Sequence, residues 1–528
     1  MRRALLTLAI LAVSCSRETP VEPAVSVPGA PVIVISIDTL RSDRLPAYGY
    51  KGVETPNLDR FRADAILFER AYSHSPMTLP AHVSMLTGLL PNEHGVRNNI
   101  GYHYDPAAHP PLTAALKKRG YVAGAAVSSY VLRGESGLAG AFDFYEDSIA
   151  PHPGAEFGEY QRTGDRTSAL ALPWIETNRA KPFFFLFHIY EPHVPYAPPE
   201  PFRSRYASAY DGEIAAADAI VGAFLSRLRE VGIYDRALII VTSDHGEGLG
   251  DHGEAQHSIL LYREAIQVPL LVKLPGGSRR GTSVEHPVGL ADIAPTVLAV
   301  AGVTGPVTGA RSLLDPAAGR AIYSETLYPR IHFGWSELKS LVSGRHHYIQ
   351  APRPELYDVV ADPAEKQNLA GMERRTATAL RETLARIPAG TDSFEPIRKE
   401  DAAKLGSLGY LGRTAGASTP NENPIDHIAL IERMRIAYVL AEQKQFDEAE
   451  RALGSLLEER PSLIDARLRL AELLVEKGRD DLAIAQYDEL MQRSTIPLPD
   501  AMLAAAALLL RQGQIDDAEI RARAALSS

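Results

Sequence analysis

Two acidic positions that each follow an apolar run are the first residues in this sequence that could do chemistry. Asp38 comes directly after the β-branched run 32–37, and Asp244 with His245 follows the apolar run 237–242. Carboxyl ends of parallel strands meet at one edge of an open α/β sheet, and ligands bind beyond that edge. One such Asp alone could be a helix cap, but two carboxylates and an imidazole together suit a divalent cation. We expect Zn²⁺ or Mn²⁺, with Ca²⁺ as a further option.

A third segment, TLPAHVSMLTG at residues 78–88, has the pattern of a turn that leads into a helix and ends at a glycine. Thr78 stands at its start, where a hydroxyl beside a bound cation would become a usable nucleophile. Pro80 fits the first turn of a helix, whose amino end favours an anion such as a transferring phosphoryl group. The alternative is that Thr78 only caps the helix.

The composition describes a large folded protein with an acidic balance. The chain has 528 residues, of which 45% are hydrophobic, and its formal net charge at pH 7 is −10. A chain of this length and composition buries a large core and has room for more than one domain. The negative charge disfavours nucleic acid as a partner. The single cysteine, Cys15, excludes intramolecular disulfides and cysteine metal sites.

The first fifteen residues have the pattern of an export signal. A positively charged start precedes the apolar run 4–13, which is too short to cross a bilayer. The segment LAVSC at 11–15 resembles a bacterial lipobox in which Cys15 would carry a lipid, with Ala12 in place of the usual Leu. We therefore predict a signal peptide at 1–15, export to the bacterial periplasm or cell envelope, and membrane contact through a lipid anchor only. The alternative is an ordinary signal peptide.

Apolar runs and helical patterns alternate after a Pro-rich tether at 16–30. This alternation predicts an α/β sandwich with a mostly parallel sheet. After about residue 330 short alternating strands predict a small antiparallel C-terminal subdomain at about 331–400, within a first unit that spans 31–413. The predicted strands lie at 32–37, 121–127, 183–188, 237–242 and 268–273, and the predicted helices at about 57–70, 111–119, 165–178 and 209–230.

Beyond a linker at 414–424, the sequence from 425 to 528 is helical and repetitive. Ala449, Ala483 and Ala518 occupy matching positions with spacings of 34 and 35, and a glycine precedes the last two by five residues. A period of about 34 with paired helices resembles tetratricopeptide repeats, of which three fit here. Such an all-α solenoid would present a concave surface to a peptide or protein partner. The alternative is a plain helical bundle.

Five stretches, taken together, resemble one family. They are VIVISIDTLRSDRLPAYGY from residue 32, TLPAHVSMLTGLLPNEHGV from 78, FHIYEPHVPYAPP from 187, VTSDHGEGLGDHGEAQHS from 241 and LADIAPTVLAVAGV from 290. They look like the sulfatase branch of the alkaline phosphatase superfamily, and ELYDVVADPAEKQNLA from 355 resembles its C-terminal subdomain. The matches run in family order from about 31 to 410. The resemblance implies an alkaline-phosphatase-like sandwich and a metal-dependent hydrolase of sulfate or phosphate esters.

The stretch 78–88 departs from the sulfatase signature at two positions. Formylglycine sulfatases carry Cys (or Ser)-x-Pro-x-Arg there, whereas Thr78 takes the Cys position and His82 the Arg position in this chain. Because Cys15 is the only cysteine, formylglycine cannot form from Cys at this site. A Thr at this position is similar to the phosphodiesterases and phosphoethanolamine transferases of the superfamily, which favours phosphate esters.

The resemblance also implies a ligand set and a substrate contact. Asn99 would contact a non-bridging oxygen of the substrate and stabilise developing charge, although the adjacent Asn98 is equally available. The residues implied for the first ion are Asp38, Thr78, Asp244 and His245.

His193 and His257 determine whether one ion binds or two. In one interpretation they bind a second ion, helped by Glu191, and the two ions clamp the attacking and leaving oxygens. In the other, His193 is the general acid and His257 contacts the anion, at a position that is usually Lys in formylglycine sulfatases. Both interpretations stay open. We expect His188 and His252 to support the site or the fold.

The sequence thus predicts a metal-dependent hydrolase of phosphate esters, foremost diesters, with Thr78 as the nucleophile. The second hypothesis is a sulfate ester hydrolase that uses the same threonine without formylglycine. The third is a catalytically inert protein that binds a partner through its helical repeats. Loops such as 128–165 would select the substrate.

Overall fold

A computed structural model gives the structure of most of the chain. It describes residues 25–149, 161–305, 309–315, 320–390, 422–493 and 498–527. The predicted signal peptide, the predicted lipid site at Cys15 and most of the two predicted linkers lie outside the described residues.

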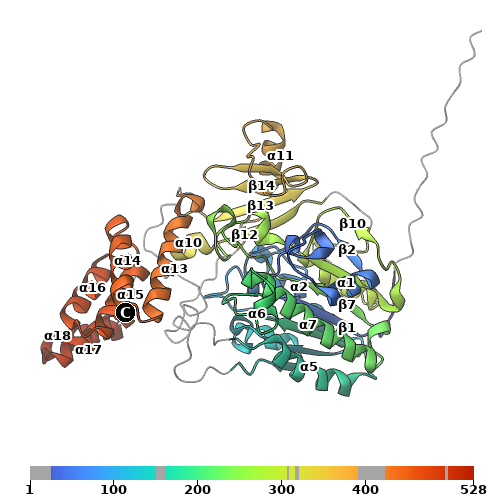
Figure 1. The fold of residues 1–528 in the computed structure, drawn as a ribbon, viewed down its shortest axis with the longest axis horizontal. Coiled ribbons are helices and arrows are strands. Elements are labelled where there is room, and N and C mark those ends of the chain that lie inside the picture. The colour runs from blue at the N-terminus through green and yellow to red at the C-terminus, as the bar shows by residue number, and fades with distance from the viewer. Residues whose placement is uncertain are drawn as a thin grey trace, which may run out of the picture.

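The centre of the structure is an eight-stranded sheet (Figure 1). In that sheet β1 pairs in parallel with β6 and β7, and β4 pairs in parallel with β5 and β6. Only β9 runs antiparallel to its neighbours, β7 and β2, among the described strands of this sheet. The sheet is therefore mostly parallel, as predicted. Its order is β10 (Ser283–Val284), β2 (Ile66–Phe68), β9 (Leu270–Lys273), β7 (Leu238–Thr242), β1 (Val32–Ile37), β6 (Phe183–Ile189), β4 (Val122–Ala126) and β5 (Phe144–Glu146).

Helices cover both faces of this sheet, and the residues of β1 divide between the two layers. Ile33, Ile35 and Ile37 pack into one apolar cluster, whereas Val32 and Val34 pack into the other. Successive side chains of a strand point to opposite faces, so a central strand covered on both sides is apolar throughout. The first layer contains α1 (Pro56–Asp64), α5 (Gly164–Asn178) and α7 (Ala209–Glu230), and the second α2 (Thr78–Thr87), α4 (Leu112–Lys117) and α9 (Ile293–Val300).

One predicted helix, 57–70, is too long. In the structure α1 ends at Asp64, Ala65 is extended, and the next three residues form β2. β2 pairs with β9 and β10, so the apolar run Ile66–Phe68 is buried in the sheet rather than on a helix face. Pairing with distant strands overrides the local helical pattern here.

Two smaller sheets complete the hydrolase part. Helix α11 (Arg374–Ala385) packs Leu380 and Leu384 against Tyr323, Leu341 and Tyr348 of a four-stranded antiparallel sheet. This is the small antiparallel sheet that the sequence predicts, and its first strand begins before the predicted subdomain start. Its strands are β12 (Ile322–Thr326), β13 (Leu338–Ser343), β14 (His346–Gln350) and β15 (Glu355–Asp358); a three-stranded sheet holds β11 (Val288–Gly289), β3 (Ala71–Tyr72) and β8 (Gln267–Val268). Short helices are α3 (Pro91–His94), α6 (Phe202–Arg205), α8 (Arg263–Ile266) and α10 (Tyr328–Phe333).

The C-terminal region is helical, and its helices pack as consecutive pairs (Figure 1). Gly478 and Gly513 lie between the helices of the second and third pairs with φ of 69° and 77°, a conformation that glycine adopts without strain. Lys444 takes the same position in the first pair with φ 59°. None of the helices in the described ranges is long and apolar enough to cross a membrane. The pairs are α13 (Ile428–Glu442) with α14 (Phe446–Glu459), α15 (Ile464–Glu476) with α16 (Asp480–Arg493), and α17 (Pro499–Arg511) with α18 (Ile515–Ser527).

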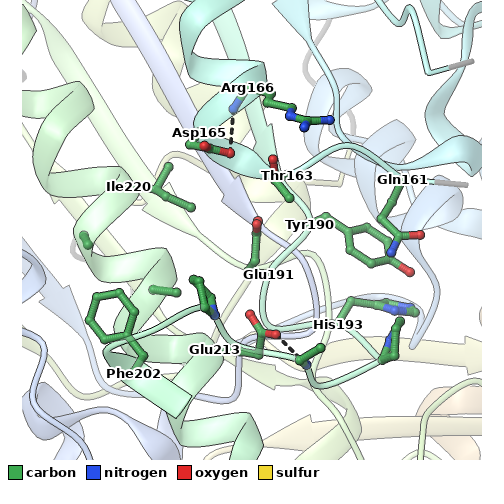
Figure 2. Close-up of a pocket in the computed structure, with 15 residues that line it drawn as sticks. Gln161, Thr163, Asp165, Arg166, Tyr190, Glu191, His193, Phe202, Glu213 and Ile220 are labelled. Atoms are coloured by element: carbon green, nitrogen blue, oxygen red, sulfur yellow. Dashed lines mark hydrogen bonds between the residues drawn. The ribbon is translucent and has the colours of Figure 1, made fainter. Parts of the chain in front are cut away.

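A cavity of about 580 Å³ opens beside the carboxyl end of β6 (Figure 2). Its walls come from α5, α7 and the segment 190–202 that follows β6. His193 and Glu191 of that segment and Glu213 of α7 all line it. A volume of this size is in the range of small-molecule sites.

The loop 246–257 after β7 is anchored to the rest of the molecule through His252. The Nδ1 atom of His252 lies 2.6 Å from Oε1 of Glu264, its Nε2 atom lies 3.2 Å from the carbonyl oxygen of Glu365, and its ring stacks on Tyr262. Burial lowers the pKa of His252, but the hydrogen bond and charge of Glu264, with help from Glu365, outweigh it and raise the pKa to about 8.

This contact predicts a stability difference that depends on pH. Because the pKa of His252 is higher in the folded state than in the unfolded state, protonation of this residue stabilises the fold. The contribution to the free energy of unfolding is roughly 2 kcal/mol; it is complete below about pH 6.5 and is lost as the pH rises through about 8. We expect His252→Gln to lower the urea midpoint at pH 6 and to change it little at pH 9. A matched variant, His346→Gln, at a half-buried histidine paired with Glu373, controls for general surface effects. An equal loss for His252→Gln at both pH values would contradict the assignment.

Candidate active site

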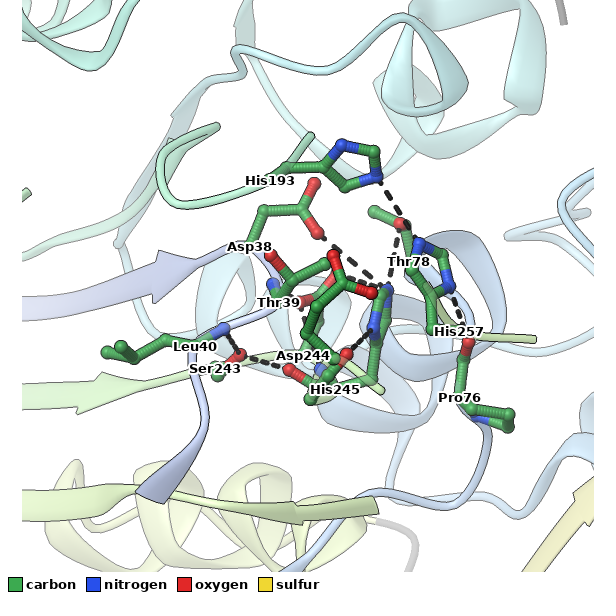
Figure 3. Close-up of polar contacts among 12 residues, drawn as sticks. Asp38, Thr39, Leu40, Pro76, Thr78, His193, Ser243, Asp244, His245 and His257 are labelled. Atoms are coloured by element: carbon green, nitrogen blue, oxygen red, sulfur yellow. Dashed lines mark hydrogen bonds and ion pairs between the residues drawn. The ribbon is translucent and has the colours of Figure 1, made fainter. Parts of the chain in front are cut away.

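Three elements bring the predicted chemical residues together at one edge of the sheet (Figure 3). Asp38 follows β1, Asp244 and His245 follow β7, and Thr78 is the first residue of α2. The Oγ1 atom of Thr78 lies 3.2 Å from Nε2 of His245. The same nitrogen lies 3.7 Å from Oδ1 of Asp38 and 3.6 Å from Oδ2 of Asp244. The four side chains therefore surround one small volume.

Three of the four carboxylate oxygens of Asp38 and Asp244 lack a hydrogen-bond partner among the described residues. Neither oxygen of Asp38 nor Oδ2 of Asp244 has a hydrogen-bond partner among the described residues, and both side chains are fully buried. Burial raises the pKa of Asp38 well above its usual range, and the charges of Asp244 and Glu247 raise it further. Burial likewise raises the pKa of Asp244 and lowers that of His245 to about 4. A divalent cation would supply the missing charge, so the donor set fits a metal ion.

The local backbone fixes which oxygen of Asp244 faces the cluster. Oδ1 of Asp244 accepts hydrogen bonds from the N–H groups of Thr39 and His245, at 3.3 and 2.9 Å. Thr39 has a left-handed φ of 53°, and the hydroxyl of Tyr210 donates to its carbonyl oxygen at 2.7 Å. The strained turn after β1 thus directs Oδ2 of Asp244 toward Asp38 and His245.

α2 is a helix that the core holds in place from end to end. All its residues are buried, and it ends at Gly88 with φ 73°. A Cβ at Gly88 would meet the side chain of Ala294 at 3.4 Å, so this end packs tightly against α9. Because the helix cannot shift along its axis, its amino end and the hydroxyl of Thr78 stay at the carboxylate cluster.

His193 and His257 face each other next to Thr78. Nδ1–H of His193 donates to the carbonyl oxygen of Val194 at 2.7 Å, and Nδ1–H of His257 donates to that of Pro76 at 3.0 Å. In the neutral rings both protons are therefore used, and the two Nε2 atoms lie 3.3 Å apart. Two nitrogen lone pairs at this distance repel unless a proton or a cation lies between them. Burial lowers the pKa of His193 to about 4 and that of His257 well below its usual range.

The structure separates the two asparagines and also places Glu191. Oδ1 of Asn99 accepts the N–H of Leu79 at 2.8 Å, which puts its amide at the amino end of α2. Asn98 instead contacts His332 at 3.1 Å. Both oxygens of Glu191 accept the N–H of Gly164 at the start of α5, so this carboxylate caps a helix rather than joining His193 and His257.

Two histidines that the sequence did not place in the ligand set also touch the cluster. Nδ1–H of His82 donates to the carbonyl oxygen of Thr78 at 2.8 Å, and the same atom lies 3.8 Å from Oδ2 of Asp244. Nδ1 of His188 accepts the N–H of Ser128, so its Nε2 carries the proton and faces Oδ2 of Asp38 at 3.5 Å. With Asp244 these two imidazoles form a second group that has metal-ligand spacing. The tautomer of His188 favours a hydrogen-bond donor that orients Asp38.

Comparison with known proteins now decides the family. The profile of the sulfatase family matches residues 31–303, which is more than half of the chain. This chain belongs to the sulfatase family. The profile "N-sulphoglucosamine sulphohydrolase, C-terminal" matches residues 250–388, and a tetratricopeptide repeat profile matches 440–494. The chain is therefore a hydrolase of the sulfatase and alkaline phosphatase superfamily with a tetratricopeptide repeat region, as predicted.

Individual relatives share low sequence identity with this chain, but the matches extend over most of the relatives' length. An arylsulfatase of Clostridium perfringens is 23% identical over 440 residues, covering 65% of this chain and 90% of the relative. The "multifunctional alkaline phosphatase superfamily protein PehA" of Trinickia caryophylli is 25% identical over 472 residues, covering 64% and 91%. Among solved structures, the phosphonate monoester hydrolase of Agrobacterium radiobacter superposes with a TM-score of 0.58 at 21% identity, covering 67% and 95%. These structural likenesses confirm the sulfatase-like fold.

The carboxylate cluster predicts metal binding that depends on both aspartates. Asp38→Asn and Asp244→Asn should each weaken divalent metal binding by at least about tenfold, because each removes a charge that no neighbour replaces. Metal content after gel filtration, measured by mass spectrometry, gives the comparison. Asp218→Asn is the matched control: this buried carboxylate accepts the N–H of Leu58 away from the site. Full metal occupancy in both cluster variants would refute the site.

Proposed function

We propose that the chain is a metal-dependent hydrolase of monoanionic esters, best suited to phosphodiesters, with Thr78 as the nucleophile. One observation carries this proposal: the hydroxyl of Thr78 lies 3.2 Å from His245 inside the group formed by Asp38, Asp244 and His245. A threonine that only capped a helix would not need two unpaired buried carboxylates beside it.

The residues present give the nucleophile its position and the anion its site. Asp38, Asp244 and His245 would hold the divalent ion, which lowers the pKa of a nearby hydroxyl and neutralises charge on the ester. Thr78 releases its Oγ1 proton to solvent, the Oγ1–P bond forms, and the bond from phosphorus to the leaving alcohol oxygen breaks as that oxygen takes up a proton. The amino end of α2 and the amide of Asn99 lie where negative charge develops on the non-bridging oxygens. Water then cleaves the phospho-threonine ester and restores the hydroxyl.

The facing histidines suit the leaving alcohol. One proton shared between Nε2 of His193 and Nε2 of His257 removes the repulsion of their lone pairs and can pass to the departing oxygen. A second ion would need carboxylate support, yet Glu191 is occupied at the start of α5. The groups of metal-ligand spacing in the described part of the chain both contain Asp244 and neither contains His193 or His257. We therefore favour one ion and a proton-sharing pair.

The charge of the site favours an ester with a single negative charge. The polar groups around Thr78 in Figure 3 are carboxylates, imidazoles and hydroxyls, and His82 and His257 stand where sulfatases carry Arg and Lys. The nearby guanidinium of Arg41 is bound to Asp43 and to the carbonyl oxygens of Glu247 and Gly248. The two negative charges of a phosphate monoester dianion would not be fully compensated in this site. A phosphodiester or a sulfate ester carries a single negative charge and needs fewer positive groups around it.

Sulfate esters are the second candidate. The family profile and relatives named as arylsulfatases favour them, whereas relatives named for phosphonate monoester hydrolysis favour phosphorus. An inert binding protein is the third candidate, and the unpaired oxygens of Asp38 count against it because such a cluster costs stability without an ion.

The remaining parts of the proposal concern the ends of the chain. We propose export through the segment 1–15, tethering through a lipid on Cys15, and a hydrolase unit at 31–413 joined to three repeats at 425–528. The repeats would recruit a peptide or protein, because stacked helix pairs offer a concave surface.

Thr78 gives the direct test of the mechanism. Thr78→Ala should lower kcat on an aryl phosphodiester by on the order of 10³-fold or more, because no other hydroxyl replaces the nucleophile. Thr78→Ser keeps the hydroxyl and should retain part of the activity. Both variants should keep the circular dichroism and melting behaviour of a folded protein. An alanine variant with unchanged kcat would rule out the threonine mechanism.

Parallel rates distinguish the two ester classes. With the same nitrophenol leaving group, we expect a higher kcat/KM for a methyl phosphodiester than for the sulfate ester, and the lowest value for the phosphate monoester dianion. The phosphate monoester comes last because it carries two negative charges at this cation-poor site. The diester precedes the equally charged sulfate ester because a Thr at the position of Thr78 resembles the phosphodiesterases of the superfamily. A higher kcat/KM for the sulfate would move the assignment to the second candidate.

A further inference from the structure

The cavity beside His193 is a space that the proposed reaction does not use. His193 belongs to both places: it lines the cavity, and its Nε2 faces His257. The ring of Tyr190 packs against the ring of His193, with centroids 4.6 Å apart. The space of about 580 Å³ therefore adjoins His193, whose ring faces His257 beside Thr78.

Three carboxylates line this cavity, and hydrogen bonds within the fold account for two of them. Asp165, an exposed residue, accepts the N–H of Arg166 at 2.8 Å. Glu191 caps α5 by accepting the N–H of Gly164 with both oxygens. Glu213 uses Oε1 to accept the N–H of Ala197 at 2.8 Å, but its Oε2 has no hydrogen-bond partner among the described residues. Glu213 is 4% exposed, so water does not compensate this oxygen fully. Burial, followed by the charge of Glu191, raises the pKa of Glu213 to about 7.

The other walls fit an organic cation better than a bare ion. Tyr190 and Phe202 present aromatic rings, and Ile220 adds an apolar wall. Aromatic faces and carboxylates together attract alkylammonium groups. The one guanidinium on the wall, that of Arg166, belongs to an exposed residue and extends away from Glu213 in Figure 2. The volume also exceeds what a single metal ion needs.

We propose that this cavity binds an alkylammonium group carried by one organic arm of the ester, with the unpaired oxygen of Glu213 as its counter-charge. The inference rests on the proposed ester hydrolysis and adds the substrate class: a monoanionic ester with a positively charged amine on one arm. The aromatic walls contact the methyl or methylene groups of the amine, and the phosphorus end lies on the other side of His193.

A pair of isosteric esters tests the proposal. The probes are 4-nitrophenyl phosphodiesters whose second arm is choline or its neutral analogue 3,3-dimethylbutanol. The metal-loaded full-length enzyme should show at least about a tenfold higher kcat/KM for the choline ester, which corresponds to roughly 1.4 kcal/mol. Glu213→Gln keeps the acceptor for Ala197 and should bring the ratio close to one, with the neutral ester little changed. Equal values for both esters in the wild type would overturn the proposal.

A control variant and a binding measurement separate this inference from the reaction mechanism. Glu230→Gln removes an exposed carboxylate at the far end of the same helix, α7, and should leave the ratio unchanged. Calorimetric binding of the two esters to Thr78→Ala gives the preference without turnover. If Thr78→Ala binds the choline ester more tightly than the neutral ester but the wild type hydrolyses neither, the subsite is supported and the proposed function is rejected. Equal binding would reject the subsite whatever the rates.

The choline cation occurs both in small soluble esters and in lipid headgroups. Competition with the choline probe in the hydrolysis assay distinguishes these two sources. Glycerophosphocholine and phosphatidylcholine vesicles are added separately to the wild-type reaction with the choline probe. Inhibition by glycerophosphocholine alone would identify a small soluble ester as the source, and inhibition by vesicles a lipid surface. Inhibition by neither would count against an alkylammonium subsite.

Discussion

The burial of two carboxylates with three unpaired oxygens between them is the constraint around which this site is organised. Asp38 and Asp244 follow the adjacent strands β1 and β7. Both side chains are fully buried, so neither can turn toward solvent. Buried charges of one sign are stable only when a cation or a proton compensates them. Burial raises the pKa of both aspartates, which favours protonation when no cation is bound. In the proposed function a divalent ion would compensate the same charges and would also activate Thr78.

The apolar core supplies the rigidity that such an arrangement needs. β1 is buried on both faces, so its position is fixed by packing against α1, α5 and α7 on one side and α2, α4 and α9 on the other. α2 carries Thr78, the proposed nucleophile, and belongs to one of these layers. A single packed body therefore sets the distance between Thr78 and the strand ends. Close-packed interiors resist small shifts, which keeps reacting groups in register.

The sequence predicted the parts of the site that follow from local pattern. An apolar run followed by Asp or Asp-His identified the strand ends, and the segment 78–88 identified the helix that carries Thr78. We expected His188 to support the site or the fold, but its tautomer was beyond such reasoning, because it depends on Ser128, which is far away in the chain. The end of α1 was misjudged for a similar reason, since β2 forms only when β9 and β10 are beside it. The cavity near Glu213 also arises from segments that only the fold brings together.

The helical repeats contact the hydrolase next to the loop that follows the metal-ligand candidates. Oε1 of Glu432 in α13 accepts the N–H of Ala255, within the loop 246–257. Arg435, one turn further along α13, lies close enough to Glu247 to oppose the rise in pKa that burial causes there. The charge of Glu247 in turn raises the pKa of Asp38. Electrostatic interaction falls with distance but is weakly screened in a buried setting. The repeats therefore contact the loop that carries Glu247, and a positive charge on α13 lies within electrostatic range of this buried carboxyl group.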